Sequence, residues 1–462
     1  MWASLKVKSW EADYEVASQT RPQTRLRSIA RDHTFTLVLA SIAALHCALF
    51  VYFVERASLR VPVYDFLDWL VFYDNRMQAG DWLGYLWGAH NEHRIVLSRI
   101  LLAADVRWFG GDGTAFVVSG FVLLIGVIGV LCREIWKSNL SSSWKAVAIP
   151  CLIIVLTPVA TVITIGVPVF GVFLQTAAFA VFAVVLLDGA GEETRWSDWR
   201  RAAALGAGCL SGFGISGGLL IWPVLLWAAW RGKLGWRWIG VIAAAGAAFI
   251  AVYLRGLPVP AESRLLSMGH PIEMFDYAIR FLGLPWSHLY QLVWPSRLVG
   301  LCLLGLGGYL LVDDGLSATA TPRLHRVGLA LVLFVLLLAA AIVSARADVA
   351  EDRQMPIRYT LLVVLAHVGL LLFALPLLQR VWDGPRRLLL QCAMLTLAVA
   401  LVCQQVIAGK YAVQEANRYK EAWARFAAGE WSPDMLHYVY PDRDAAQAMV
   451  ARLRQMGLYQ GN

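Results

Sequence analysis

Long apolar blocks separated by short polar clusters dominate this chain. The blocks are roughly 15 to 22 residues long, close to the length of helix that crosses a hydrocarbon core of about 30 Å. Backbone groups inside lipid must be paired within their own segment, and the blocks lack the period-two alternation of a transmembrane β-barrel. The pattern therefore predicts an all-α polytopic membrane protein.

The blocks predict about eleven transmembrane helices. Two of these, residues 202–213 and 219–230, are short, and we expect them to be half-helices that meet at the glycine-rich stretch SGFGISGG. The expected spans are residues 34–54, 114–132, 146–163, 167–187, 202–213, 219–230, 238–254, 298–312, 327–345, 359–378 and 388–408.

Charge at the ends of the blocks predicts the topology. Residues 1–33 are polar and basic, too long and too charged for the n-region of a cleavable signal peptide, so we expect a cytoplasmic tail. With the N-terminus inside, every cytoplasmic loop is basic, as the positive-inside rule requires. The basic residues of these loops are Arg133, Lys137, Lys145, Arg195, Arg200, Arg201, Arg231, Lys233, Arg237, Arg323, Arg326, Arg380, Arg386 and Arg387. We expect a multi-pass protein of a bacterial inner membrane.

The periplasmic side then receives the long segments. The transmembrane domain, residues 34–408, has periplasmic loops at 55–113, 255–297 and 346–358, and residues 409–462 follow as a small periplasmic segment. These segments are mixed in charge and rich in Trp, Tyr, Pro and His, so we expect functional surface there. The last segment predicts two short amphipathic helices around a Tyr-Pro-Asp turn, which cap the outer face.

Composition agrees with a membrane protein. Of the 462 residues, 59% are hydrophobic and 16% charged, against about 25% charged in soluble domains. The net charge of +8 could indicate nucleic acid, but most basic residues lie at the ends of predicted helices, so we expect contact with membrane lipids and no nucleic-acid partner. The 7 cysteines lie in or beside apolar blocks without CxxC spacing, which favours packing over disulfides or metal binding.

The first periplasmic loop carries carboxylates at helical spacing. In YDFLDW, a helix that begins near Tyr64 places Asp65 and Asp68 on one face, with Trp69 available to lie in the interface. Aspartate there can take a proton from an acceptor hydroxyl, or it can bind a divalent cation. The alternative is that Asp65 caps the helix and Asp68 is a solvated charge.

A dense polar cluster follows in the same loop. We expect HNEHR, from His90 to Arg94, to open a second amphipathic helix. Arg94 and Arg99 can hold phosphate, because a guanidinium reaches two oxygens at once, and His93 can move a proton or donate a hydrogen bond. The alternative is an interfacial helix with a salt-bridged polar face. A zinc site from His90, Glu92 and His93 is disfavoured, because adjacent helical positions diverge by about 100°.

A late periplasmic loop brings basic residues to the start of a span. Arg353 lies in this loop, and Arg358 and Tyr359 stand where the following apolar block begins. At the membrane surface this pair can meet a lipid phosphate, or it can serve as a simple interfacial anchor.

Together these features resemble the GT-C glycosyltransferases, polytopic enzymes that use polyprenyl-phosphate sugars as donors. The resemblance rests on the first span followed by YDFLDW and NEHRI, on RY at the start of a late span, and on the tail after the last span. It implies Asp65 as the preferred base, with Asp68 as its substitute or partner. It also implies that the donor phosphate is bound by Arg94, Arg353, Arg358 and Tyr359. The substrate-binding residues that it implies are Glu92, His93 and Trp69.

The function implied by this resemblance is transfer of a sugar from a polyprenyl-phosphate donor to a periplasmic glycan or lipid acceptor, with inversion at the anomeric carbon. No cofactor is implied, apart from the divalent cation that the aspartates could bind. Two alternatives stay open: an O-antigen polymerase or ligase, and a non-enzymatic transporter of lipids or solutes. A transporter is disfavoured because the charged residues lie at the ends of the spans.

Overall fold

The computed structural model describes residues 22–188, 197–258, 271–287, 293–317, 321–346 and 357–459. Regular structure in these ranges consists of α-helices and short 3-10 helices, and the β-type pairing is an isolated bridge between His90 and His93. The all-α prediction is confirmed for this part of the chain.

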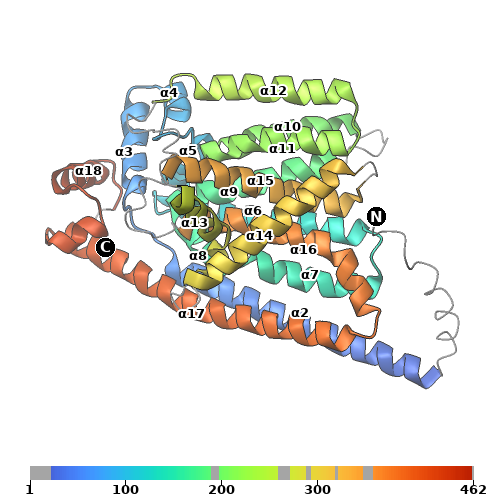
Figure 1. Cartoon of the computed structure of the whole chain (residues 1–462). Coiled ribbons are helices and arrows are strands. Elements are labelled where there is room, and N and C mark those ends of the chain that lie inside the picture. Colours follow the sequence, from blue (N-terminus) through green and yellow to red (C-terminus); the bar gives the residue numbers. More distant parts are fainter. Residues whose placement is uncertain are drawn as a thin grey trace.

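Eight helices of the described residues are long and apolar enough to cross a membrane. They pack side by side in Figure 1, and together they make this a multi-pass membrane protein. The eight are α2 (Pro22–Ala57), α6 (Thr114–Lys137), α9 (Gly171–Asp188) with the preceding turn η2 (Pro168–Phe170), α12 (Trp236–Leu254), α14 (Val293–Leu316), α15 (Arg323–Arg346), α16 (Thr360–Trp382) after the turn η7 (Ile357–Tyr359), and α17 (Arg387–Ala427).

The other three expected spans form shorter helices. The first is broken into α7 (Ser142–Leu156) and α8 (Val159–Gly166) at Pro158, because proline cannot continue the hydrogen-bond ladder. The next two are α10 (Ser197–Gly212) and α11 (Ile221–Arg231), joined by η4 (Ser216–Leu220). This confirms short helices on either side of the glycine-rich stretch, while the count of eleven spans stays a prediction.

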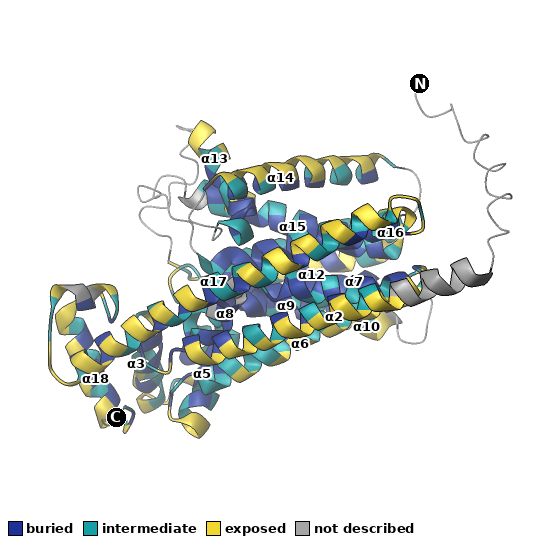
Figure 2. Cartoon of the chain, turned by 90° about the horizontal axis from the view of Figure 1, so that it is seen from below, coloured by how far each residue is buried: buried dark blue, intermediate teal, exposed yellow. Residues whose placement is uncertain are grey.

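The core of the bundle lies in α9, α15 and α16, which are the most buried of these helices. Figure 2 shows buried residues in the middle of the bundle and exposed stripes along α2, α14 and α17. Close packing depends on glycine: a side chain on Gly328 of α15 or Gly369 of α16 would collide with the carbonyl oxygen of the other glycine. Small residues let helix backbones approach in this way.

The two ends of the bundle differ in what they carry. At one end, which we call the loop end, lie α3 (Asp65–Gln78), α4 (Trp82–Trp87), α5 (Val96–Phe109), α13 (Pro271–Leu282) and α18 (Arg443–Gln455); this is the left side of Figure 1. The opposite end, which we call the basic end, carries Arg133, Arg231, Arg323 and Arg380 at or near helix ends.

The last helix corrects the expected boundary at residue 409. We expected two short helices in residues 409–462. The second forms as α18, but the first is part of α17, which continues without interruption to Ala427. No proline interrupts this stretch, and Gly409 is accommodated because its bare backbone packs against the Phe53 ring of α2. The turn η8 (Pro433–His437) then leads to α18, whose first turn is capped by the Asp442 side chain, which accepts from the Ala445 N–H at 2.9 Å.

Candidate functional site

Helix α3 presents two carboxylates at the loop end of the bundle. It begins at Asp65, as the sequence predicts, after Tyr64 turns the chain with a φ of 49°. The Tyr64 N–H donates to the Val439 carbonyl at 2.9 Å, which ties the start of the helix to the C-terminal segment. Phe66 and Leu67 are buried on the other face, so Asp65 and Asp68 point away from the core.

Asp65 is the more accessible carboxylate. Its side chain is 55% exposed, and its Oδ2 lies 3.8 Å from Nε2 of His90. The neighbouring His90 ring holds the pKa of Asp65 below its usual range, and the charges of Arg358 and His93 lower this pKa further. Asp65 is therefore ionised at neutral pH. It interacts electrostatically with Arg358, which comes from a distant part of the chain.

Asp68 has a different environment. The Tyr440 hydroxyl donates to its Oδ1 at 3.0 Å. Burial raises the pKa of Asp68 despite this hydrogen bond, and the negative charge of Asp65 raises it further. Asp68 and His90 both line a cavity of about 290 Å³, whose wall also includes Trp69, Asn75, Tyr85 and Arg99. The two aspartates thus differ in solvent access and in proton affinity.

The histidines belong to a tight turn and not to a helix. The N–H of His90 donates to the carbonyl of His93 and the N–H of His93 donates to the carbonyl of His90, each at 2.9 Å. Asn91 adopts a left-handed φ of 50°, and α5 begins only at Val96. The expectation that this cluster opens the second helix is therefore wrong, because the reciprocal backbone pairing closes a turn first.

Hydrogen bonds orient both imidazole rings. The Ser216 N–H donates to Nδ1 of His93 at 3.2 Å, so the neutral ring carries its proton on Nε2, 3.5 Å from Oε1 of Glu92. Trp69 Nε1 donates to Nε2 of His90 at 3.2 Å. Trp69 and Ser216 thus orient the rings of His90 and His93, respectively.

The glycine-rich stretch supplies the backbone contact to His93. Ser216 stands in η4, directly between the short helices α10 and α11. A Cβ on Gly218 would collide with the Ser211 carbonyl, so the stretch folds this tightly only with glycine there. The glycines in the sequence predicted that the backbone here approaches another group closely, but they did not indicate that this group is His93.

The guanidinium of Arg94 is hydrogen-bonded to backbone carbonyls. Its guanidinium is buried, stacks on the Trp87 ring at 4.6 Å, and donates to the Tyr253 carbonyl at 2.6 Å and to the carbonyls of Trp87 and Arg255. This geometry favours a role in fastening the α4–α5 region to the end of α12, in place of the predicted contact with a donor phosphate.

Arg99 behaves in the same way. It is buried, and it donates to the carbonyls of Gly88 at 2.6 Å and Leu86 at 3.2 Å. Burial lowers the pKa of this guanidinium to about 10, which still leaves it charged at neutral pH. It fixes the wall of the cavity beside Asp68.

The late loop contributes Arg358. Tyr359 is buried, with its ring centroid 5.1 Å from that of Phe173 and 5.7 Å from that of Phe281, so it packs inside the bundle. Arg353 lies outside the part of the chain that the structure describes. Arg358 lies over the Tyr359 ring at 5.7 Å, and its charge lowers the pKa of Asp65, whereas Tyr359 has a packing role.

Tyr440 is the site residue that the sequence did not indicate. It lies 372 residues from Asp68 and reaches it because α18 packs beside α3, where Arg452 Nε lies 2.5 Å from Asp74 Oδ2. No local pattern in the sequence predicts this hydrogen bond between Tyr440 and Asp68.

No metal centre is formed by the residues described: no group of three or more His, Cys, Asp or Glu side chains among them could hold an ion. Asp65 and Asp68 could contribute ligands to a cation held partly by a substrate, as carboxylates do for Mg²⁺ at phosphates.

Compared with models of protein families, with curated proteins and with solved structures, the chain has no match.

Proposed function

We propose that this chain is a membrane glycosyltransferase of the GT-C type, which transfers a sugar from a polyprenyl-phosphate donor to a glycan or lipid acceptor. The observation that carries the proposal is the exposed carboxylate of Asp65 at the loop end of the bundle, whose Oδ2 lies 3.8 Å from Nε2 of His90. The charge of Arg358 contributes to the lowered pKa of this carboxylate. A second carboxylate and a histidine line the adjoining cavity.

The proposed setting is a bacterial inner membrane crossed about eleven times, with a cytoplasmic N-terminus and a periplasmic C-terminus. Support comes from the basic end, where the arginines gather, because basic residues favour the cytoplasmic side. An active site at the opposite end then faces the periplasm. Nucleotide sugars stay in the cytoplasm, so the donor there is a sugar already carried across on a lipid.

In the proposed reaction an acceptor hydroxyl attacks the anomeric carbon of the donor. The new bond joins the acceptor oxygen to that carbon, and the bond between the carbon and the phosphate oxygen breaks. The hydroxyl proton passes to Asp65, and polyprenyl phosphate leaves with the electron pair. One displacement inverts the anomeric carbon.

Arg358 and His93 stabilise the leaving group. Arg358 can pair with the phosphate, and a guanidinium suits this task because its planar fork reaches two phosphate oxygens. His93, with its proton on Nε2, can donate a further hydrogen bond to a substrate oxygen. Asp68, held by Tyr440, shapes the negative potential beside the base and is well placed to bind a sugar hydroxyl.

Substitution of the two aspartates tests this assignment. In membranes of a strain with a measurable glycan phenotype, Asp65→Asn should lower the rate of polyprenyl-phosphate release about 10²- to 10⁴-fold, which is the usual contribution of a general base. Asp68→Asn should reduce it less, because the amide still accepts from Tyr440. Asp444→Asn is the matched control, since Asp444 is exposed on α18.

A transporter would respond differently. Its function would tolerate Asp65→Asn and Asp68→Asn alike, and no polyprenyl phosphate would be released. Full glycan synthesis by a well-expressed Asp65→Asn, Asp68→Asn double variant would refute the enzyme assignment.

A further inference from the structure

A second cavity, of about 430 Å³, lies at the basic end of the bundle, far from α3 and α18 in sequence and in space. It is lined by side chains of α6, α9 and α10, together with Arg323 at the start of α15. Helices α6 and α10 both pack against α9, which forms the back of the cavity. The apolar part of its wall includes Val130, Phe179, Phe182, Leu186, Ala203 and Leu210.

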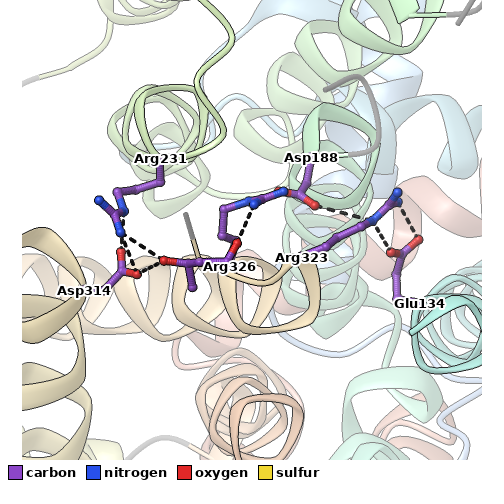
Figure 3. A network of polar contacts seen from close by, with 7 residues as sticks. Glu134, Asp188, Arg231, Asp314, Arg323 and Arg326 are labelled. Carbon is purple, nitrogen blue, oxygen red and sulfur yellow. Dashed lines mark hydrogen bonds and ion pairs between the residues drawn. The ribbon is translucent and has the colours of Figure 1, made fainter. Parts of the chain in front are cut away.

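Three arginines line this cavity, and its described lining includes no carboxylate. They are Arg133 on α6, Arg200 on α10 and Arg323 on α15. Arg323 is held in place, because its Nε lies 2.7 Å from Glu134 Oε2 and 3.4 Å from Asp188 Oδ2, as Figure 3 shows. Those two carboxylates face Arg323 and fix one wall of the cavity.

The cavity has a charged mouth and an apolar body. Along α10 its lining runs from Arg200 to Leu210, a rise of about 15 Å at 1.5 Å per residue. The arginine end is the membrane-surface end of these helices, and Trp136 and Trp199 stand exposed beside it, at 66% and 62% of their surface. Exposed tryptophans mark the level of lipid headgroups.

We propose that this cavity binds an anionic phospholipid of the adjacent leaflet. The phosphate lies between Arg133 and Arg200, and the upper part of an acyl chain packs against Phe179, Phe182 and Leu210. Charge complementarity selects an anion, and the apolar body selects one that carries a hydrocarbon tail. Basic pockets between transmembrane helices bind lipid headgroups by the same physics. The proposal does not depend on glycosyl transfer.

Lipid-dependent thermal stability of the purified full chain in a nonionic detergent tests the proposal. The probes are dioctanoyl phosphatidylglycerol, dioctanoyl phosphatidylcholine and inorganic phosphate, and the readout is the concentration of each that gives half of its maximal rise in Tm. Phosphatidylglycerol should stabilise the protein with saturation, and the other two should not.

Three variants locate the site. Arg133→Gln and Arg200→Gln should each weaken the phosphatidylglycerol response about five-fold, the value of one cationic contact near a lipid surface. Gly206→Leu keeps every charge and extends a side chain into the cavity, because Gly206 lines it and a Cβ at this position meets no other atom within 4 Å. It should abolish the response with little change in the Tm of the lipid-free protein. Arg237→Gln, on exposed α12 surface at the same end, is the matched control and should respond like the unaltered chain.

Several results would overturn the proposal. Equal stabilisation by phosphatidylcholine would show only general solvation by lipid, and equal stabilisation by inorganic phosphate would show an anion effect without a tail. An unchanged response in Gly206→Leu, or the same loss in Arg237→Gln as in Arg133→Gln, would place the lipid elsewhere.

Discussion

The carboxylates of the basic-end network and Asp65 at the loop end differ in how closely they are paired. At the basic end, charged side chains from five helices form a network of close ion pairs, drawn in Figure 3. Their distances are 2.6 Å for Arg231 Nε to Asp314 Oδ2, 2.7 Å for Arg326 Nε to Asp188 Oδ1 and 2.7 Å for Arg323 Nε to Glu134 Oε2. At the loop end, Asp65 is exposed and lies 3.8 Å from its nearest ionisable partner atom, in His90.

This difference separates carboxylates that stabilise the fold from one that can take part in a reaction. A buried carboxylate must be paired, since an unpaired charge in a low dielectric is costly, and a fully paired one has little freedom to accept a proton. The network at the basic end therefore holds helices together. Asp65 keeps solvent access and is not held in a close ion pair, so its carboxylate can accept a proton from a substrate.

Removal of one carboxylate from the basic-end network should give the largest loss of stability. Asp188→Ala leaves Arg323 and Arg326 short of a partner, so the free energy of unfolding in mixed micelles should fall by about 3–5 kcal/mol. The matched change at a surface pair is Asp198→Ala, where Asp198 is 81% exposed beside Arg201, and it should cost less than about 1 kcal/mol. Equal losses would remove the contrast between buried and surface pairs.

The two arginines of the candidate site sharpen the contrast within the loop end. Arg94→Met leaves three backbone carbonyls without a donor, so the free energy of unfolding should fall by about 2–3 kcal/mol. Arg358→Met should change stability by less than about 1 kcal/mol, while lowering donor binding. Thermal unfolding in detergent, together with donor titration, measures both. A stable Arg94→Met variant that fails to bind donor would return Arg94 to the phosphate site.

The pH dependence of stability gives the smallest effect, with opposite signs at the two aspartates. The folded-state pKa of Asp68 is raised, so the native state binds more protons and stability falls as the pH rises through the window from the unfolded to the folded pKa. The folded-state pKa of Asp65 is lowered, so its contribution is present above the unfolded pKa and is lost as the pH falls through the folded one.

Substitution by asparagine isolates each contribution. As the pH rises from acid to neutral, Asp68→Asn should gain stability relative to the unaltered chain and Asp65→Asn should lose it. Each change should stay below about 1 kcal/mol because solvent screens these groups. Apparent Tm against pH measures the sign, and curves of the same sign would contradict the distinct environments of the two carboxylates.

The helix that carries Asp65 and Asp68 could be anticipated from spacing alone. The three-residue interval from Asp65 to Asp68 and the apolar positions between them predicted α3, and the structure has it. His90 to Arg94 drew notice as a polar cluster, but its turn depends on reciprocal backbone pairing and on the left-handed φ of Asn91. Helical periodicity carries no information about either.

By itself the sequence determined the all-helical, multi-pass architecture, because the length and apolarity of each block are local properties set by the thickness of the hydrocarbon layer. Only the tertiary structure decided which charged side chains are paired with other groups of the protein. It placed Arg94 on carbonyls, Arg323 between two carboxylates, and Tyr440 on Asp68. Those partners come from distant helices, and a short-range pattern cannot encode which surfaces meet when the bundle closes.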